Sequence, residues 1–166
     1  MATGIKVFAP ASVANLACGY DILGLALERP GDEIIIRKTD GKGLKINKIF
    51  GADRKLPTDI HKNTAGLAAY ALLKSVDRIG EGIEMDIYKK MPSGSGLGSS
   101  AASAAAAVWG INALLDLRLT KRELLHFAVL GEQAADGSYH ADNVAPSLMG
   151  GIIFIRDNES LDIHKL

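Results

Sequence analysis

A segment rich in glycine and serine near the middle of the chain has the residue types that bind phosphate. Glycines let a backbone approach a ligand closely, and the unpaired N–H groups and dipole of a following helix attract negative charge. Serine hydroxyls can bind a phosphate oxygen or Mg²⁺. The pattern therefore predicts a phosphate-binding loop. Its residues are Pro92, Ser93, Gly94, Ser95, Gly96, Leu97, Gly98, Ser99, Ser100, Ala101 and Ala102.

Two common phosphate-binding motifs do not fit this segment. Its glycine spacing is not G-x-G-x-x-G, and no lysine follows Gly98 as a Walker loop requires. A flexible turn capped by serine is the alternative, because glycine-rich turns are common. The alanine-rich helix expected after it favours the phosphate site, since small side chains let that helix lie close against a sheet and fix its N-terminus. Trp109 in this helix is interpreted as a core residue.

The first part of the chain is expected to be rich in β-strands. Strands are predicted at 5–9, closing at Pro10, and at 32–38, with a turn at 29–31 before the second. Residues 40–43 have turn chemistry, so they predict a hairpin leading into a strand at 44–49.

The rest of the chain alternates helical and extended patterns. Helices are predicted from Asn63 to the glycines at 80 and 82, from Ser99 to Leu115, and from the capping box at Thr120 to about Ala134. Strands are predicted at 82–91, at 152–155 and, as an edge strand, at 161–164, with a polar loop over 136–147.

Composition and charge predict a compact cytoplasmic protein with a small-molecule partner. Of the 166 residues, 48% are hydrophobic and 23% charged, enough for one core. The 19 basic and 19 acidic residues balance, which argues against a nucleic-acid or membrane partner. The N-terminus does not resemble a signal peptide, and the weakly polar run 101–115 is too short to span a bilayer. Cys18 is interpreted as a small apolar residue in a reducing compartment.

Three segments together resemble a known family. Residues 92–102 are similar to the ATP loop of the GHMP kinases, which phosphorylate galactose, homoserine, mevalonate and phosphomevalonate. Residues 10–21 and 140–146, the latter leading to Gly150-Gly151, resemble the homoserine-phosphorylating branch. The resemblance implies an α+β fold, a two-layer mixed sheet with helices on one face, similar to ribosomal protein S5 domain 2. It makes residues 1–166 the N-terminal, ATP-binding domain.

The resemblance also implies roles for individual residues. Asn15 and Asp21 would hold the acceptor amino acid, with the Asp21 carboxylate on its ammonium group. His140 and Asn143 would approach from the opposite wall. Asn63 would lie near the adenine, and Ser100 and Glu132 would complete a Mg²⁺ shell around the ATP phosphates.

Each of these residues has a simpler alternative role. Asn15 and Asp21 could order turns around Gly19, and His140 could form a surface pair with Asp142. Glu132 could be a solvated helix residue, and Asn63 only a helix cap.

The reacting centre departs from other branches of the family. Ser12 stands where those branches have a lysine, and Asn143, rather than Asp142, falls at the position of their aspartate. The hypothesis is that no strong general base operates. Catalysis would then depend on aligning the hydroxyl with the γ-phosphate and on neutralising charge, with the proton passing to the phosphate.

Family members are about twice as long as this chain and carry a C-terminal domain. The chain is therefore expected to be a truncated form of a homoserine-phosphorylating enzyme that uses ATP and Mg²⁺, and exposed apolar surface would favour homo-oligomers. Two alternatives stay open: a nucleotide-binding or assembly module without turnover, and a kinase for another small alcohol such as mevalonate.

Overall fold

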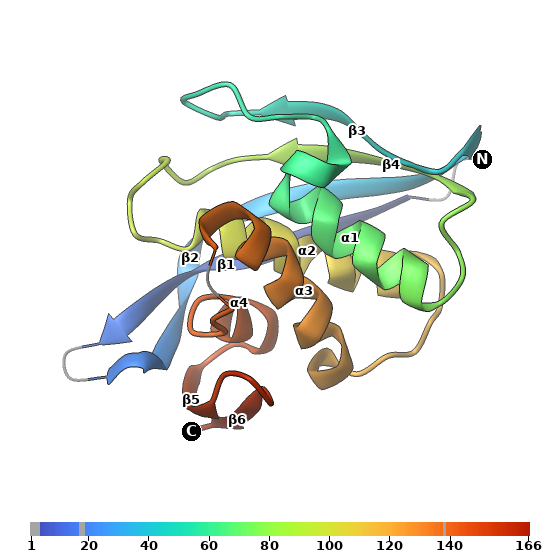
Figure 1. Ribbon diagram of the computed structural model, residues 1–166. Coiled ribbons are helices and arrows are strands. Elements are labelled where there is room, and N and C mark those ends of the chain that lie inside the picture. The colour runs from blue at the N-terminus through green and yellow to red at the C-terminus, as the bar shows by residue number, and fades with distance from the viewer. Residues whose placement is uncertain (1–3, 17–18, 138) are drawn as a thin grey trace.

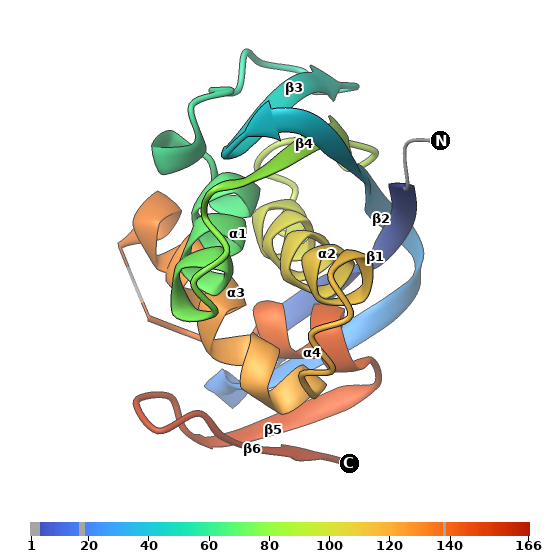
Figure 2. The same cartoon turned by 90° about the vertical axis from the view of Figure 1, so that its right-hand side faces the viewer.

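The computed structural model describes residues 4–16, 19–137 and 139–166, so the interpretation of Cys18 lies outside the described residues. Within them, a six-stranded mixed sheet curves around the helices, which lie on its concave side (Figures 1 and 2). Its strand order is β3-β4-β2-β5-β6, and β1 pairs with β2. The predicted α+β fold class is confirmed.

The strands and helices have the following bounds. The strands are β1 (Gly4–Leu16), β2 (Gly19–Lys42), β3 (Leu44–Phe50), β4 (Glu81–Tyr88), β5 (Ile152–Asp157) and β6 (Asp162–Lys165). The helices are the 3-10 turn η1 (Ile60–Lys62), α1 (Thr64–Ser75), α2 (Ser99–Leu114), α3 (Lys121–Asp136) and α4 (Val144–Met149).

Strands β1 and β2 form a long antiparallel pair through residues that were expected to end strands. Pro10 pairs with Gly31, so the predicted end at Pro10 and the predicted turn at 29–31 are both wrong. Proline is tolerated here because β1 pairs with β2 alone among the described strands, and the register shifts just after Pro10. Glycine is needed at 31 because a β-carbon there would lie 2.4 Å from the Phe8 ring. The Pro-Gly pair thus serves strand packing.

The predicted hairpin at 40–43 is also wrong. Strand β3 does not pair with β2, because β4 lies between them and pairs with β3 in parallel. The long connection through α1 makes this possible, since parallel neighbours need a crossover. Alternation in β4 is as predicted, with Ile83, Met85 and Ile87 in the core.

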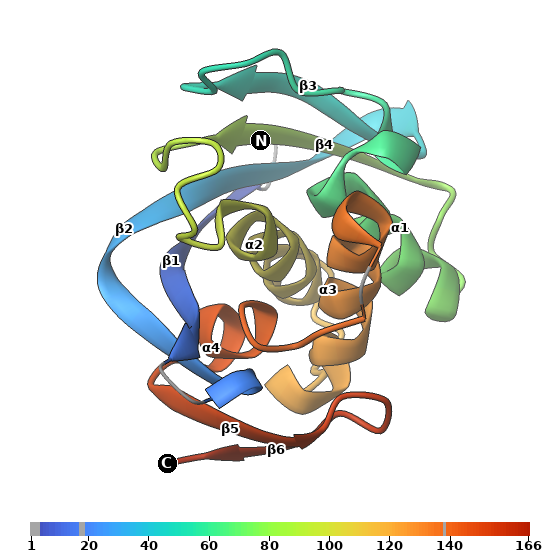
Figure 3. The same cartoon turned by 60° about the vertical axis from the view of Figure 1, so that its left-hand side comes forward.

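Helix α2 lies at the centre of the fold, between the sheet and the helices α1 and α3 (Figure 3). Its alanines are buried on every side, as predicted. Gly110 permits the close approach, because a β-carbon there would lie 2.5 Å from Cδ1 of Ile36 in β2. Trp109 is not a core residue: it is 37% exposed, and Lys121 lies 5.4 Å from its ring centre. The buried sides of α2 are packed closely through alanines, so the large indole of Trp109 lies at the edge of the core.

The capping box that starts α3 is confirmed, with Thr120 and Glu123 bonded reciprocally. Helix α4 occupies part of the predicted polar loop, so that part of the loop prediction is wrong. It escaped the sequence pattern because it has six residues and contains Pro146. No helix among the described residues has the length and apolar character to cross a membrane.

Candidate functional site: a glycine-rich loop at the start of a buried helix

The glycine-rich loop lies between β4 and α2, where the sequence placed it. Gly94, Gly96 and Gly98 have positive φ angles of 71°, 73° and 61°, which favour glycine. Gly98 is the N-cap of α2, and no side chain among the described residues caps that helix. The first-turn amides of α2 therefore remain able to bind an anion.

A pocket of about 480 Å³ opens between this loop and the segment that precedes α1. Its size is in the range of small-ligand sites. Three cationic residues line it: Arg54, Lys62 and Lys89. Loop residues 92–100 line it as well, with Asn63 and Thr64 on the opposite side. The charges of Arg54 and Lys62, together with the helix amides at one wall, suit a polyphosphate.

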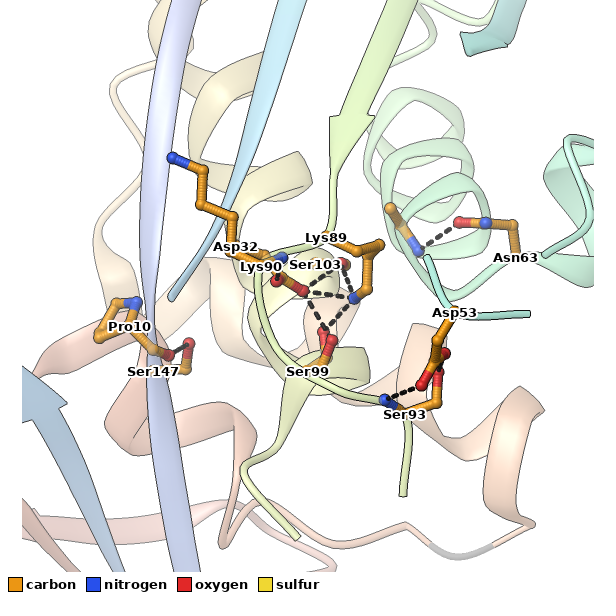
Figure 4. Close-up of polar contacts among 11 residues, drawn as sticks. Pro10, Asp32, Asp53, Asn63, Lys89, Lys90, Ser93, Ser99, Ser103 and Ser147 are labelled. Atoms are coloured by element: carbon orange, nitrogen blue, oxygen red, sulfur yellow. Dashed lines mark hydrogen bonds and ion pairs between the residues drawn. The ribbon is translucent and has the colours of Figure 1, made fainter. Parts of the chain in front are cut away.

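Asn63 is both a helix cap and a pocket residue. Its Oδ1 accepts hydrogen bonds from the amides of Ala65 (3.0 Å) and Gly66 (3.3 Å), and its Nδ2 donates to the carbonyl of Pro57 at 3.0 Å. Asn63 therefore caps α1, and its position at the pocket is also compatible with an adjacent ligand. Figure 4 shows Asn63 at the start of α1, with its amide oxygen directed at a backbone N–H of the first turn.

Two acidic residues that the sequence analysis missed hold the loop. Asp53 accepts hydrogen bonds from the backbone amide (3.1 Å) and hydroxyl of Ser93, which lower the pKa of its carboxyl. Asp32, in β2, accepts from the Ser99 hydroxyl at 2.7 Å and pairs with Lys89 (Figure 4). In the sequence, Asp32 stands out only as a charged residue at the start of a predicted strand rich in isoleucine. Sequence spacing alone could not indicate its partner 57 residues away.

Ser12 and Asn143, the two residues assigned to the reacting centre, are in contact. The Ser12 hydroxyl donates to Oδ1 of Asn143 at 2.9 Å, and the Ser12 amide donates to the carbonyl of Leu97 at 3.1 Å. A β-carbon at Gly98 would lie 2.2 Å from Ser12 Oγ and 2.8 Å from Asn143 Oδ1. Thus β1, the glycine-rich loop and the N-cap of α4 meet at one point.

A second polar group lies near the β1–β2 connection. Asn15 and Asp21 both have positive φ, and Oδ1 of Asn15 accepts from the Asp21 amide at 2.8 Å. His140 Nδ1 lies 3.4 Å from Oδ1 of Asp21, so its ion-pair partner is Asp21 and not Asp142, the partner in the alternative role. Asn15 therefore orders the backbone at Asp21, and the half-exposed Asp21 and His140 side chains face each other.

Asp142 is a buried carboxyl next to this group. Only 6% of it is exposed, and burial raises the pKa of its carboxyl. Its Oδ1 accepts from the Asn143 amide at 2.9 Å, which acts in the opposite direction. Asp142 therefore orders the backbone at Asn143.

Comparisons with known proteins show the family to which this chain belongs. Residues 63–151, which include the loop, α2 and Asn143, match the family described as GHMP kinases N terminal domain. The chain belongs to the GHMP kinase family. It is similar to the homoserine kinase of Chlorobium phaeovibrioides, with 44% identity over 96% of this chain and 52% of the relative.

Solved GHMP kinase structures are similar in fold. A homoserine kinase from Cytophaga hutchinsonii superposes with a TM-score of 0.93 and 51% identity, over 98% of this chain and 51% of that one. The mevalonate kinase of Methanococcus jannaschii superposes with a TM-score of 0.76 and 17% identity, over 99% of this chain and 56% of that one. At this identity the similarity shows the fold alone. The chain spans about half the length of the relatives it matches.

The residues assigned to Mg²⁺ in this GHMP kinase domain have suitable chemistry. Ser100 lines the pocket in the first turn of α2, and the carboxylate of Glu132 in α3 acts electrostatically on Lys89, which also lines the pocket. The described residues contain no cluster of three or more acidic, histidine or cysteine side chains for a metal. Mg²⁺ in nucleotide sites usually takes one or two protein oxygens and several waters or phosphates, so a hydroxyl and a carboxylate fit it.

Proposed function

We propose that the chain is the nucleotide-binding and acceptor-binding half of a kinase that transfers the γ-phosphate of ATP to the hydroxyl of L-homoserine, giving O-phospho-L-homoserine. The observation that carries the proposal is the meeting of Ser12 and Asn143 at Gly98, where the phosphate-binding loop becomes α2. The 51% identity to a homoserine kinase of known structure supports this acceptor.

In this proposal the acceptor and the nucleotide occupy opposite sides of the Ser12–Asn143 contact. The triphosphate would lie along residues 92–100 toward Asn63, and the homoserine ammonium group would bind near the carboxylate of Asp21. Asn15 and His140 would hold the acceptor indirectly, since both contact Asp21.

The transfer would depend on positioning. The homoserine oxygen forms a bond to the γ-phosphorus while the bond from that phosphorus to the bridging oxygen of ADP breaks, and the hydroxyl proton passes to the transferred phosphate. Asn143, held by Ser12 and by the carboxyl of Asp142, would orient the hydroxyl. The amides at the start of α2 would stabilise charge on the phosphate oxygens. Mg²⁺, held by Ser100 and Glu132, would neutralise phosphate charge.

A second candidate is a module that binds nucleotide without turnover. The chain aligns with only about half of each relative, so groups that the relatives carry elsewhere are not among the residues described here. The third candidate, a different small alcohol as acceptor, keeps the nucleotide site and changes only the acceptor.

A coupled assay of ADP release, with homoserine, mevalonate and galactose offered separately, tests these candidates. We expect turnover with homoserine. Turnover with mevalonate or galactose alone would favour the third candidate. ATP binding without turnover on any acceptor would favour the second.

The compartment and assembly state are also proposals. We propose a cytoplasmic enzyme without nucleic-acid or membrane partners, in keeping with its balanced charge. Association into homo-oligomers is proposed from exposed apolar side chains such as Phe8, Trp109 and Ile152.

A further inference from the structure

A buried ion pair lies directly beneath the first turn of α2. Asp32 is fully buried in β2, and both its carboxylate oxygens are used. Oδ1 accepts from the Lys90 amide at 2.8 Å, and Oδ2 accepts from the Ser99 hydroxyl and from the Lys89 ammonium. One carboxylate thus joins β2, the two residues that follow β4 and the start of α2.

The Lys89 ammonium is held by three partners. Besides Asp32, it donates to the carbonyl of Ser99 and to the hydroxyl of Ser103, each at 2.8 Å (Figure 4). An ammonium group has three donors, so these contacts use all of them. Although Lys89 lines the pocket, its charge is therefore directed at Asp32 and α2 and is not free for a phosphate. Only 9% of its side chain is exposed, and burial lowers the pKa of its ammonium, which the carboxylates of Asp32 and Glu132 oppose.

A negative charge at this place would oppose the proposed function. The positive end of a helix dipole attracts anions. An uncompensated carboxylate next to it would offset the positive potential of the helix and would repel a triphosphate. Burial makes the repulsion stronger, because solvent screens it less. The ammonium of Lys89 cancels the carboxylate charge while the hydrogen bonds keep α2 in place.

We propose that Lys89 is a positioning residue that acts on nucleotide affinity through Asp32: it neutralises the carboxylate that anchors α2, so that the start of this helix stays attractive to phosphate. The inference rests on the proposed nucleotide-binding function and adds two residues to it. It predicts that the effect of Lys89 depends on the presence of the Asp32 charge.

A double-mutant cycle tests this dependence. The dissociation constant for ATP with Mg²⁺ is measured by calorimetry for wild type, Lys89→Met, Asp32→Asn and the double variant. We expect Lys89→Met to weaken ATP binding on the order of tenfold, because it leaves a buried carboxylate uncompensated near the phosphates. Asp32→Asn alone should bind ATP at least as tightly as wild type. The double variant should recover most of the lost affinity.

Arg37→Met is the matched control. Arg37 in β2 pairs with the largely buried Asp86 of β4 at 2.6 Å, and neither residue lines the pocket. This variant removes an ion pair between β2 and β4, so it should lower the melting temperature and leave the ATP dissociation constant unchanged. Loss of ATP affinity in Arg37→Met would mean that any damage to this sheet suffices, and would overturn the proposal.

The other outcomes of the double-mutant cycle also support or overturn the proposal. Equal loss of affinity in Lys89→Met and in the double variant would show that Lys89 acts on the phosphates directly, and would overturn the proposal. If Lys89→Met does not fold, the folded double variant still tests it, because near-wild-type ATP affinity is expected and a loss contradicts it. Failure of wild type to bind ATP would instead contradict the proposed function.

Discussion

The Ser12 hydroxyl donates a hydrogen bond to Oδ1 of Asn143 at 2.9 Å, across 131 residues of sequence. The contact lies against Gly98, the residue at which the glycine-rich loop turns into α2. It ties the proposed acceptor side of the site to the proposed phosphate side. Substitutions around this point therefore test the account most sharply.

Gly98→Ala should impair both stability and ATP binding. A β-carbon there would lie 2.2 Å from Ser12 Oγ, and the positive φ of 61° disfavours any L-residue by roughly 1–2 kcal/mol. Relief of the clash requires the loop or Ser12 to move. We expect a lower melting temperature and a weaker ATP dissociation constant, measured by thermal unfolding and calorimetry.

Gly94→Ala is the control for Gly98→Ala. Gly94 has a similar φ of 71°, but a β-carbon there would meet nothing within 4 Å. Gly94→Ala should be disfavoured only by the positive φ of the backbone, so its losses of melting temperature and ATP affinity should be smaller than those of Gly98→Ala. An equal or larger effect in Gly94→Ala would mean that the contact with Ser12 and Asn143 does not matter.

Asn143→Ala should lower kcat with homoserine far more than Asp142→Asn does. Asn143 is placed to orient the hydroxyl, and losing one such polar group typically lowers kcat on the order of a hundredfold. Asparagine at 142 retains an oxygen to accept from the Asn143 amide, so most activity should remain. Steady-state kinetics of both variants decides. Near-normal activity in Asn143→Ala with complete loss in Asp142→Asn would instead identify Asp142 as a general base.

Asp142 should also make stability depend on pH. Burial raises the pKa of its carboxyl above 3.8, so the folded state binds this proton more tightly than the unfolded state does. The free energy of unfolding contributed by Asp142 therefore falls as pH rises from 3.8 through the raised pKa. Asparagine does not titrate. Urea unfolding at several pH values should show Asp142→Asn gaining stability relative to wild type over that interval, and a constant difference would refute the shift.

Asn63→Ala should destabilise the fold by about 1 kcal/mol, because α1 loses its N-cap hydrogen bonds to Ala65 and Gly66. If Asn63 also lies near the adenine, ATP binding should weaken as well. Thr120→Ala is the control, since it removes a comparable cap from α3, away from the residues that line the pocket. Urea unfolding and ATP titration of both variants separate the two effects. Equal ATP affinity in the two variants would leave Asn63 with a capping role alone.

Local sequence patterns predicted the three longer helices and most strands because their causes are local. The capping box at Thr120 and the alternation around Met85 depend on neighbours a few residues away. The pairing of β1 with β2 through Pro10 and Gly31 does not. It depends on how two strands and the Phe8 ring pack, and the same dipeptide in another context forms a turn.

The residues of the candidate site also divide into those with a local sequence pattern and those that depend on long-range packing. The place of the glycine-rich loop between a strand and a helix was predictable, because its glycine content and the pattern of the following helix are local features of the sequence. Ser12 and Asn143 came from family resemblance, and their contact came only from the structure. Asp32 and Lys89 were missed because neither belongs to a motif, and burial of a charge is known only once the sheet and α2 are placed.

The central claim is that the backbone amides between Pro92 and Ser100 bind the triphosphate of ATP. Amide chemical shifts of the ¹⁵N-labelled protein, followed as ATP with Mg²⁺ is added, test it directly. We expect the largest shifts at residues 93–101, with smaller ones at Asn63 and at the segment around Asn143. Saturable ATP binding that leaves residues 93–101 unshifted, or no ATP binding in the intact protein, would contradict the account.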